Sequence, residues 1–182
     1  IQPGAPYTLI TFSGSCNLPP GVSTLFTNTQ NFRGGVTFAV AANAITATFG
    51  SAPASLTWRG DGLANAWDLL TTPNWRNGGS PDTFNQADAV TFDNTGSNNV
   101  PVTLVGNNIN PSLVTFNASK DYTLAGTALT GYGKLVKQNS GLLTVLNANP
   151  MLGGTLIGGG TVQVGNNSVA SPIFSNKNGM SR

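Results

Sequence analysis

The sequence contains no histidine and no glutamate, and its only cysteine is Cys16. Histidine is the commonest general base and zinc ligand, and glutamate is one of the two usual carboxylic acids of hydrolases. A lone cysteine cannot form an intrachain disulfide, and no histidine is present to activate its thiolate, so we expect Cys16 to be a small buried hydrophobic residue. These absences predict that the protein is not an enzyme and has no catalytic residues.

Charge is also scarce. Charged residues make up 8% of the chain, against roughly 25% in an ordinary soluble domain. The eight basic and six acidic side chains are dispersed and give a net charge of only +2, which argues against a nucleic-acid groove. No apolar run approaches the roughly 20 residues of a membrane-spanning helix. We therefore expect no nucleic-acid partner, no membrane span and no cofactor, with calcium left open.

The most informative segment is residues 131 to 167, in which short apolar and Thr-rich runs recur between Gly or Asn residues at roughly ten-residue spacing. Val162 and Val164 alternate with Thr161 and Gln163, which suits a half-buried strand. Glycines between the runs permit sharp corners. The pattern predicts stacked turns of a β-solenoid.

The same segment resembles the passenger-associated transport repeat, also called the autotransporter-associated β-strand repeat, of secreted and surface proteins of bacteria. It departs from the repeat at Asn139, where a glycine is usual, and at Pro150 with Met151. The matching positions are Gly133, Leu135, Lys137, Ser140, Gly141, Leu143, Val145, Asn149, Gly153, Gly154, Thr155, Ile157, Gly160, Val162, Val164, Gly165 and Asn166.

Residues 56 to 95, with three Trp residues, are similar to the segment that often precedes such repeats in large secreted bacterial proteins. The opening YTLITFSG resembles the strand that usually follows a run of repeats. The chain begins at Ile1 without an initiator Met or a leader, which suggests a mature or excised segment. The resemblance implies an extracellular or cell-surface location.

The expected fold is all-β: a short β-solenoid with an N-terminal antiparallel β segment. The N-terminal segment is expected at residues 1 to 56, and the Trp-rich segment with the solenoid repeats at residues 57 to 182. Strands are expected at residues 7–12, 90–92, 102–105, 113–116, 142–146 and 161–164. Only residues 62 to 70 could form a short helix, with Asp61 as its N-cap.

A solenoid buries one continuous apolar stripe, so a shared core is expected. Its expected members are Leu135, Leu143, Val145, Ile157, Val162 and Val164. The opening segment has no charge and alternates apolar residues with threonine, which makes it the expected assembly strand, with Tyr7, Leu9, Ile10 and Phe12 as its apolar residues.

Two ligand sites can be considered. Aromatic faces could stack on sugar rings, and the candidates for glycan binding are Trp58, Trp67, Trp75, Tyr122 and Tyr132. Packing in the core or at a cap is the favoured interpretation of the Trp residues. Asp82, Asp88 and Asp93 offer the oxygen ligands that calcium prefers, but their spacing fits no calcium-loop pattern, and capping or solvation is favoured.

These observations predict an extracellular structural or adhesive protein, and more sharply a fibre subunit. In that hypothesis copies of the chain bind one another head to tail, the N-terminal strand of one completing the β-structure of the next. The alternatives are a monomeric adhesin passenger module excised from a longer secreted protein, or a carbohydrate-binding module that recognises surface glycans. A β-helix polysaccharide enzyme is a distant third.

Overall fold

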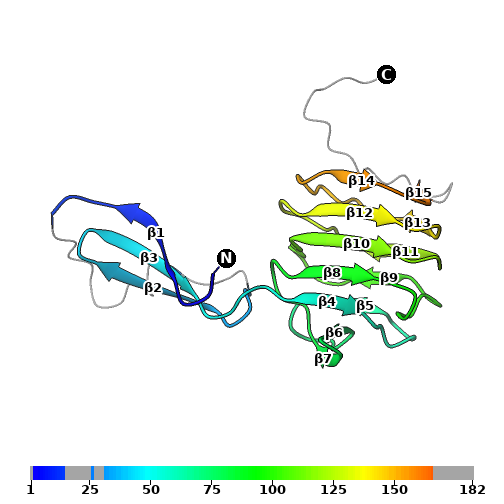
Figure 1. Ribbon diagram of the computed structural model, residues 1–182, viewed down its shortest axis with the longest axis horizontal. Helices are drawn as coiled ribbons and strands as arrows, with labels where there is room; N and C mark the ends of the chain where they lie inside the picture. Colours follow the sequence, from blue (N-terminus) through cyan, green and yellow to red (C-terminus); the bar gives the residue numbers. More distant parts are fainter. Residues whose placement is uncertain (1, 15–25, 27–30, 166–182) are drawn as a thin grey trace, which may run out of the picture. The chain divides into compact units, whose positions relative to one another are not determined.

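The computed structural model of the protein describes residues 2–14, 26 and 31–165. Its regular elements are fifteen β-strands, and no helix occurs among these residues. The chain divides into two compact units, Ile1–Pro53 and Ala54–Arg182. The second unit is a β-solenoid and the first contains an antiparallel sheet (Figure 1), so the expected fold class is confirmed.

The first unit contains strands β1 (Pro6–Thr11), β2 (Val36–Ala41) and β3 (Ala44–Phe49), and β3 lies between the other two. Cross-strand neighbours share a face of such a sheet. Tyr7 and Phe38 both lie opposite Ala47, and Thr8 lies opposite Thr46 on the other face. One face is therefore apolar and the other rich in threonine. Cys16, expected to be buried, lies outside the described residues.

The solenoid has five levels, each built from two strands, which make about four turns. Figure 1 shows the levels stacked one above another. The first strand of each level joins one parallel array: β4 (Ser55–Trp58), β8 (Ala89–Phe92), β10 (Leu113–Asn117), β12 (Lys134–Gln138) and β14 (Thr155–Ile157). The second strands join another: β5 (Ala66–Trp67), β9 (Val102–Leu104), β11 (Tyr122–Gly126), β13 (Leu142–Val145) and β15 (Thr161–Val164).

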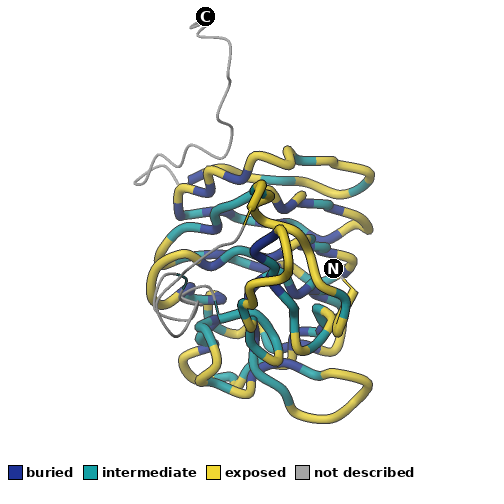
Figure 2. The backbone as a smooth tube through the Cα atoms, turned by 90° about the vertical axis from the view of Figure 1, so that its left-hand side faces the viewer, coloured by how far each residue is buried: buried dark blue, intermediate teal, exposed yellow. Residues whose placement is uncertain are grey.

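From the second level onward, residues that lie opposite one another are 19 to 24 positions apart in the chain. Within each strand, alternate side chains point into the coil and out to solvent. One inward column consists of the buried residues Val90, Val114 and Leu135. The next residues of the first two strands, Thr91 and Thr115, lie outward and are less buried. Figure 2 shows this alternation of buried and less buried residues along the coils. The period-two pattern of the sequence therefore continues from level to level.

The corners between strands use residues with left-handed backbone. Gly126 has a φ of 88°, and a Cβ there would lie 2.2 Å from the carbonyl oxygen of Leu104 in the preceding coil. Asn139, which departs from the repeat pattern, has a φ of 60°. Asparagine tolerates this conformation better than most residues, so the substitution keeps the corner geometry that glycine would provide.

A hairpin inserted between β5 and β8 covers the first level of the solenoid. Its strands are β6 (Trp75–Asn77) and β7 (Ser80–Asp82), and β6 pairs antiparallel with β4 (Figure 1). Gly78 and Gly79 join them with φ values of 54° and 93°, as two-residue hairpin turns favour. The Trp-rich segment therefore covers one end of the solenoid, as one expectation allowed.

The six expected strands are observed within one residue of their predicted bounds, as β1, β8, β9, β10, β13 and β15. The possible helix at residues 62–70 does not form. Instead Asp61 Oδ1 accepts backbone N–H bonds from Leu63, Ala64 and Asn65, which closes a turn, and β5 begins at Ala66. Strand β4 begins at Ser55, two residues before the boundary expected from the sequence, and pairs with β8 in the second unit.

Candidate functional site

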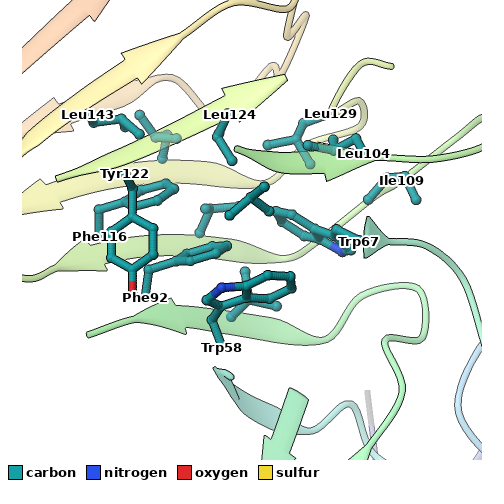
Figure 3. Packing of buried hydrophobic residues seen from close by; sticks show 14 of the residues in the cluster. Trp58, Trp67, Phe92, Leu104, Ile109, Phe116, Tyr122, Leu124, Leu129 and Leu143 are labelled. Atoms are coloured by element: carbon teal, nitrogen blue, oxygen red, sulfur yellow. The ribbon is translucent and has the colours of Figure 1, made fainter. Parts of the chain in front are cut away.

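The aromatic residues of the solenoid form a packed cluster at its first levels. Trp58, Trp67 and Trp75 are completely buried, and their neighbouring ring centroids lie 4.9 and 5.1 Å apart at steep angles. Phe92 joins this group and stacks on Phe116 of the next coil at 4.3 Å. Figure 3 shows Trp58, Phe92 and Phe116 following one another along the core. The cluster joins the hairpin end to the repeats.

The predicted glycan platform is therefore wrong for four of its five residues. Stacking on a sugar needs an exposed ring face, but Trp58, Trp67 and Trp75 have none and Tyr122 is 2% exposed. The Trp58 indole donates to the Ser97 carbonyl, and the Tyr122 hydroxyl donates to the Asp93 carbonyl. Tyr132 alone is accessible, at 85% exposure. The apolar area that suggested ligand binding is used in packing the core.

The predicted calcium ligands do not converge. Asp88 is buried and accepts backbone N–H bonds from Ala54 and Asn85, so it fastens the start of β4 to the next coil. Asp82 accepts from the Thr83 backbone and the Asn77 side chain, and Asp93 accepts from Thr95. Among the described residues, no three His, Cys, Asp or Glu side chains are placed to share a metal ion. These three carboxylates therefore do not form one calcium site; they accept local backbone N–H groups, in agreement with the capping role favoured from the sequence.

Buried amide side chains join successive coils at one corner of the solenoid. The side chains of Asn147 and Asn149 bond each other, and Asn149 Oδ1 also accepts the backbone N–H of Leu129 from the preceding coil. Two coils earlier, Gln86 Oε1 accepts the backbone N–H of Asn110. These amides satisfy corner backbone groups that would otherwise be buried without partners.

Lys137 matches the repeat pattern, but neither a buried position nor a role was predicted for it from the sequence. It lies on β12 at an inward position and is 2% exposed. Its Nζ donates to the carbonyl oxygens of Gln138, Asn139 and Gly159 at 2.7, 2.8 and 3.3 Å. Burial lowers the pKa of Lys137, and the negative charge of Asp121 acts weakly against that shift. The period-two alternation of Leu135, Val136 and Lys137 could have indicated this inward position, because Lys137 lies on the same face of the strand as Leu135.

The expected shared core is present for most of its members. Leu135, Leu143 and Val145 are buried, and Val162 packs partly against the same cluster. Two members were predicted wrongly as buried residues. Ile157 lies opposite Lys137 and Val164 lies opposite Val145, both at inward positions, yet they are 50% and 42% exposed. They belong to the last described level, where no further described coil packs on them.

The two ends of the solenoid differ in how their edge strands are protected. At the first end, the edge of one sheet is β7, which contains Pro81 and Asp82, and the edge of the other is β5, which has two residues. Short strands, proline and charge all discourage further pairing. At the last end the edges are β14 and β15, which contain neither charge nor proline and pair without a register shift.

The predicted assembly strand corresponds to β1, which is exposed at all six positions. Leu9 and Ile10 are 48% and 46% exposed, and Tyr7 is 37% exposed with its ring edge-on to Phe49. One edge of β1 already pairs with β3, with an irregularity between Thr8 and Ile10. Phe12 follows the strand and donates its N–H to Asn43. Among the described strands, β1 thus pairs along one edge only.

Comparison with protein-family models, curated proteins and solved structures found no match. The likeness to the autotransporter-associated repeat therefore stays a prediction from the sequence. The described part of the chain contains no helix that is long and apolar enough to cross a membrane.

Proposed function

We propose that this protein is an extracellular structural or adhesive subunit whose copies associate end to end through β-strand pairing. One observation carries the proposal. The first end of the solenoid is covered by a hairpin and an aromatic cluster, whereas the described last level presents two uncharged strand edges with apolar side chains.

Exposed strand edges tend to pair with other chains, and monomeric proteins usually block them with charge, proline or a bulge. The first end of this solenoid is blocked in this way. The last described level, with β14 and β15 at its edges, lacks such protection and is suited to receive a strand. The two ends of the second unit therefore differ in how readily they should pair. This polarity favours end-to-end association over random aggregation.

The composition supports a structural role. Only 8% of the residues are charged, so long-range repulsion between copies is weak. The described acidic side chains are used in turns, and no described His, Cys, Asp or Glu cluster is placed for metal chemistry. The extracellular location depends on the resemblance to the autotransporter-associated repeat and is part of the proposal.

The competing proposal is a monomeric adhesin or carbohydrate-binding module. Its support is weaker because Tyr132 is the only accessible member of the five aromatic candidates. A single exposed ring can contribute to a glycan site but cannot form the row of rings that the sequence suggested.

Negative-stain electron microscopy of the purified chain, together with light scattering over a hundredfold range of concentration, tests the proposal. We expect periodic fibres whose length increases with concentration. Isolated particles of constant mass over the whole range would reject the fibre subunit and favour the monomeric module.

A further inference from the structure

The backbone of β14 has hydrogen-bonding groups directed away from the solenoid. The Gly154 carbonyl accepts from Leu135, and the Gly158 N–H donates to Lys137, so both glycines face β12. Successive residues of a strand direct their backbone groups to opposite sides. The N–H and C=O groups of Thr155 and Ile157 therefore point to the edge with which no described strand pairs, called the free edge below, and one more strand would satisfy them there.

The side chains beside this edge are apolar on both faces of the sheet. Leu156 points outward and is 49% exposed, and Ile157 points inward and is 50% exposed. Leu152 lies at the adjacent corner, where its N–H donates to Gly131, and is 47% exposed. A strand that paired with β14 would cover apolar surface on both faces, so it must itself be uncharged and apolar.

Among the described strands, β1 fits this requirement best. It carries no charge, its proline is confined to the first position, Pro6, and its irregularity between Thr8 and Ile10 is in the pairing with β3. Three of the exposed large apolar side chains of the described residues lie on it, Tyr7, Leu9 and Ile10. The other edge strand of its sheet, β2, contributes one, Val40. We infer that the free edge of β14 binds strand β1 of a second copy of this chain. This inference rests on the proposed end-to-end association and names the two surfaces that meet.

The contact joins two different surfaces, since β1 belongs to the first unit and β14 to the second. Such a contact leaves β14 of one copy and β1 of the other available to further copies. Copies can therefore add at both ends, and the assembly stays open unless the rotation between copies closes a ring. Pairing between two β14 edges would instead stop at a dimer. The identity of the partner edge therefore decides between a fibre and a dimer.

A substitution at Ile157 tests the acceptor edge. Ile157→Pro removes one of the two N–H groups of β14 that point away from β12, and the other belongs to Thr155. It keeps every hydrogen bond to β12, because proline is tolerated on an edge strand when its nitrogen faces away from the paired strand. We expect unchanged circular dichroism, a melting temperature within a few degrees, and loss of fibres. The matched variant Ile157→Ala keeps the N–H and should still form fibres at higher concentration. Fibres of normal length from the folded Ile157→Pro protein would overturn the inference.

Cross-linking identifies the donor strand. In a Cys16→Ser background, a Leu9→Cys chain is mixed with a Leu156→Cys chain and treated with a short bifunctional maleimide. We expect a product that contains one chain of each kind. Leu63→Cys, 84% exposed in a loop of the first level, is the control and should give little product with either. A Val40→Cys chain should also react poorly.

Other outcomes contradict the inference in distinct ways. Dimers of the Leu156→Cys chain alone would show that two β14 edges meet. A link within one chain carrying both Leu9→Cys and Leu156→Cys, at high dilution, would show that the strand pairs in its own copy. Fibres that form normally but give none of the expected product leave the proposed function standing and reject only this contact, whereas an unmodified chain that never associates rejects both.

Discussion

The interior of the solenoid contains a lysine whose ammonium group donates hydrogen bonds to backbone carbonyls. An ammonium group has three hydrogens to donate, and Lys137 directs its Nζ to three carbonyl oxygens, one of them in the next coil. Lys137 lies in an inward column between Phe116 of the preceding coil and Ile157 of the next coil. It fastens the corner after β12 to the next coil through these carbonyls.

Replacing Lys137 with methionine should destabilise the protein. Lys137→Met keeps most of the apolar volume but removes three charge-assisted hydrogen bonds to backbone carbonyls, at a cost of about 1–3 kcal/mol. Urea unfolding followed by circular dichroism measures the change. The control is Lys134→Met on the same strand, whose side chain is exposed, and we expect a change of no more than about 0.5 kcal/mol there. Equal effects at the two positions would contradict the assigned role of Lys137.

Tyr122 should make the protein less stable in alkaline solution. Burial, and secondarily the negative charge of Asp93, raises the pKa of Tyr122 to about 12 from its ordinary value of 10.0. Between these two pH values the folded phenol keeps its proton while the unfolded phenol loses it. The unfolded state then binds fewer protons, so the free energy of unfolding falls as pH rises above 10.

The variant Tyr122→Phe isolates this effect. It should lose about 1 kcal/mol at pH 7, because the hydrogen bond to the Asp93 carbonyl is removed. Its stability should decline less between pH 10 and 11 than that of the unsubstituted protein. Urea unfolding at pH 7, 10 and 11 provides the comparison, and parallel alkaline declines would count against a buried, protonated phenol.

At the scale of the strand, inward and outward positions should respond differently to the same substitution. Val145 in β13 is completely buried, whereas the adjacent Thr144 lies outward. Val145→Asp places an unpaired charge in the core and should prevent folding, while Thr144→Asp should fold with a small loss of stability. Circular dichroism and thermal melting of both proteins check this. A well-folded Val145→Asp protein with an unchanged melting temperature would show that the stripe is misplaced.

The strands could be predicted from the sequence because their period-two alternation is local and recurs in every coil. Val162 and Val164 were assigned to a strand correctly, yet the exposure of Val164 depends on what packs beyond the last described level. The burial of Lys137 was missed because its partners are carbonyl oxygens of corners that lie far apart in sequence. Asp88 was considered as a calcium ligand because its partner Ala54 is 34 residues away.

The same limit applies to the aromatic residues. Their positions in the sequence indicated a cap or core as well as a glycan platform, and only the pairing of β4 with both β6 and β8 decides between the two. Because the hairpin adds its own tryptophan to the first level, the three indoles meet in the interior. The three indoles are buried because strands far apart in sequence pair with one another, and local residue patterns do not reveal that pairing.

At the scale of the whole molecule, stability should be nearly constant between about pH 5.5 and 8.5. The chain has no histidine, the side chain whose unperturbed pKa lies in this range. Backbone N–H groups of Asn65 and Leu63 lower the pKa of Asp61, so its contribution is complete above pH 3.8 and is lost only as pH falls further. We expect melting temperatures within about 2 °C across the range by differential scanning calorimetry. A marked change of melting temperature within this pH range would contradict the prediction and reveal a group that titrates there.

The parallel stacking also determines how the molecule should respond to tension. Tyr122 and Leu143 lie opposite each other across neighbouring coils, 21 residues apart, so detaching one coil releases roughly 70 Å of extended chain. The level formed by β14 and β15 is held on one side only among the described strands, whereas the first level is locked by interleaved indoles. A pull from the C-terminal side should therefore peel the solenoid in discrete steps of similar length, beginning at β14 and β15, and an optical trap would record the force rising as the peeling reaches the tryptophans.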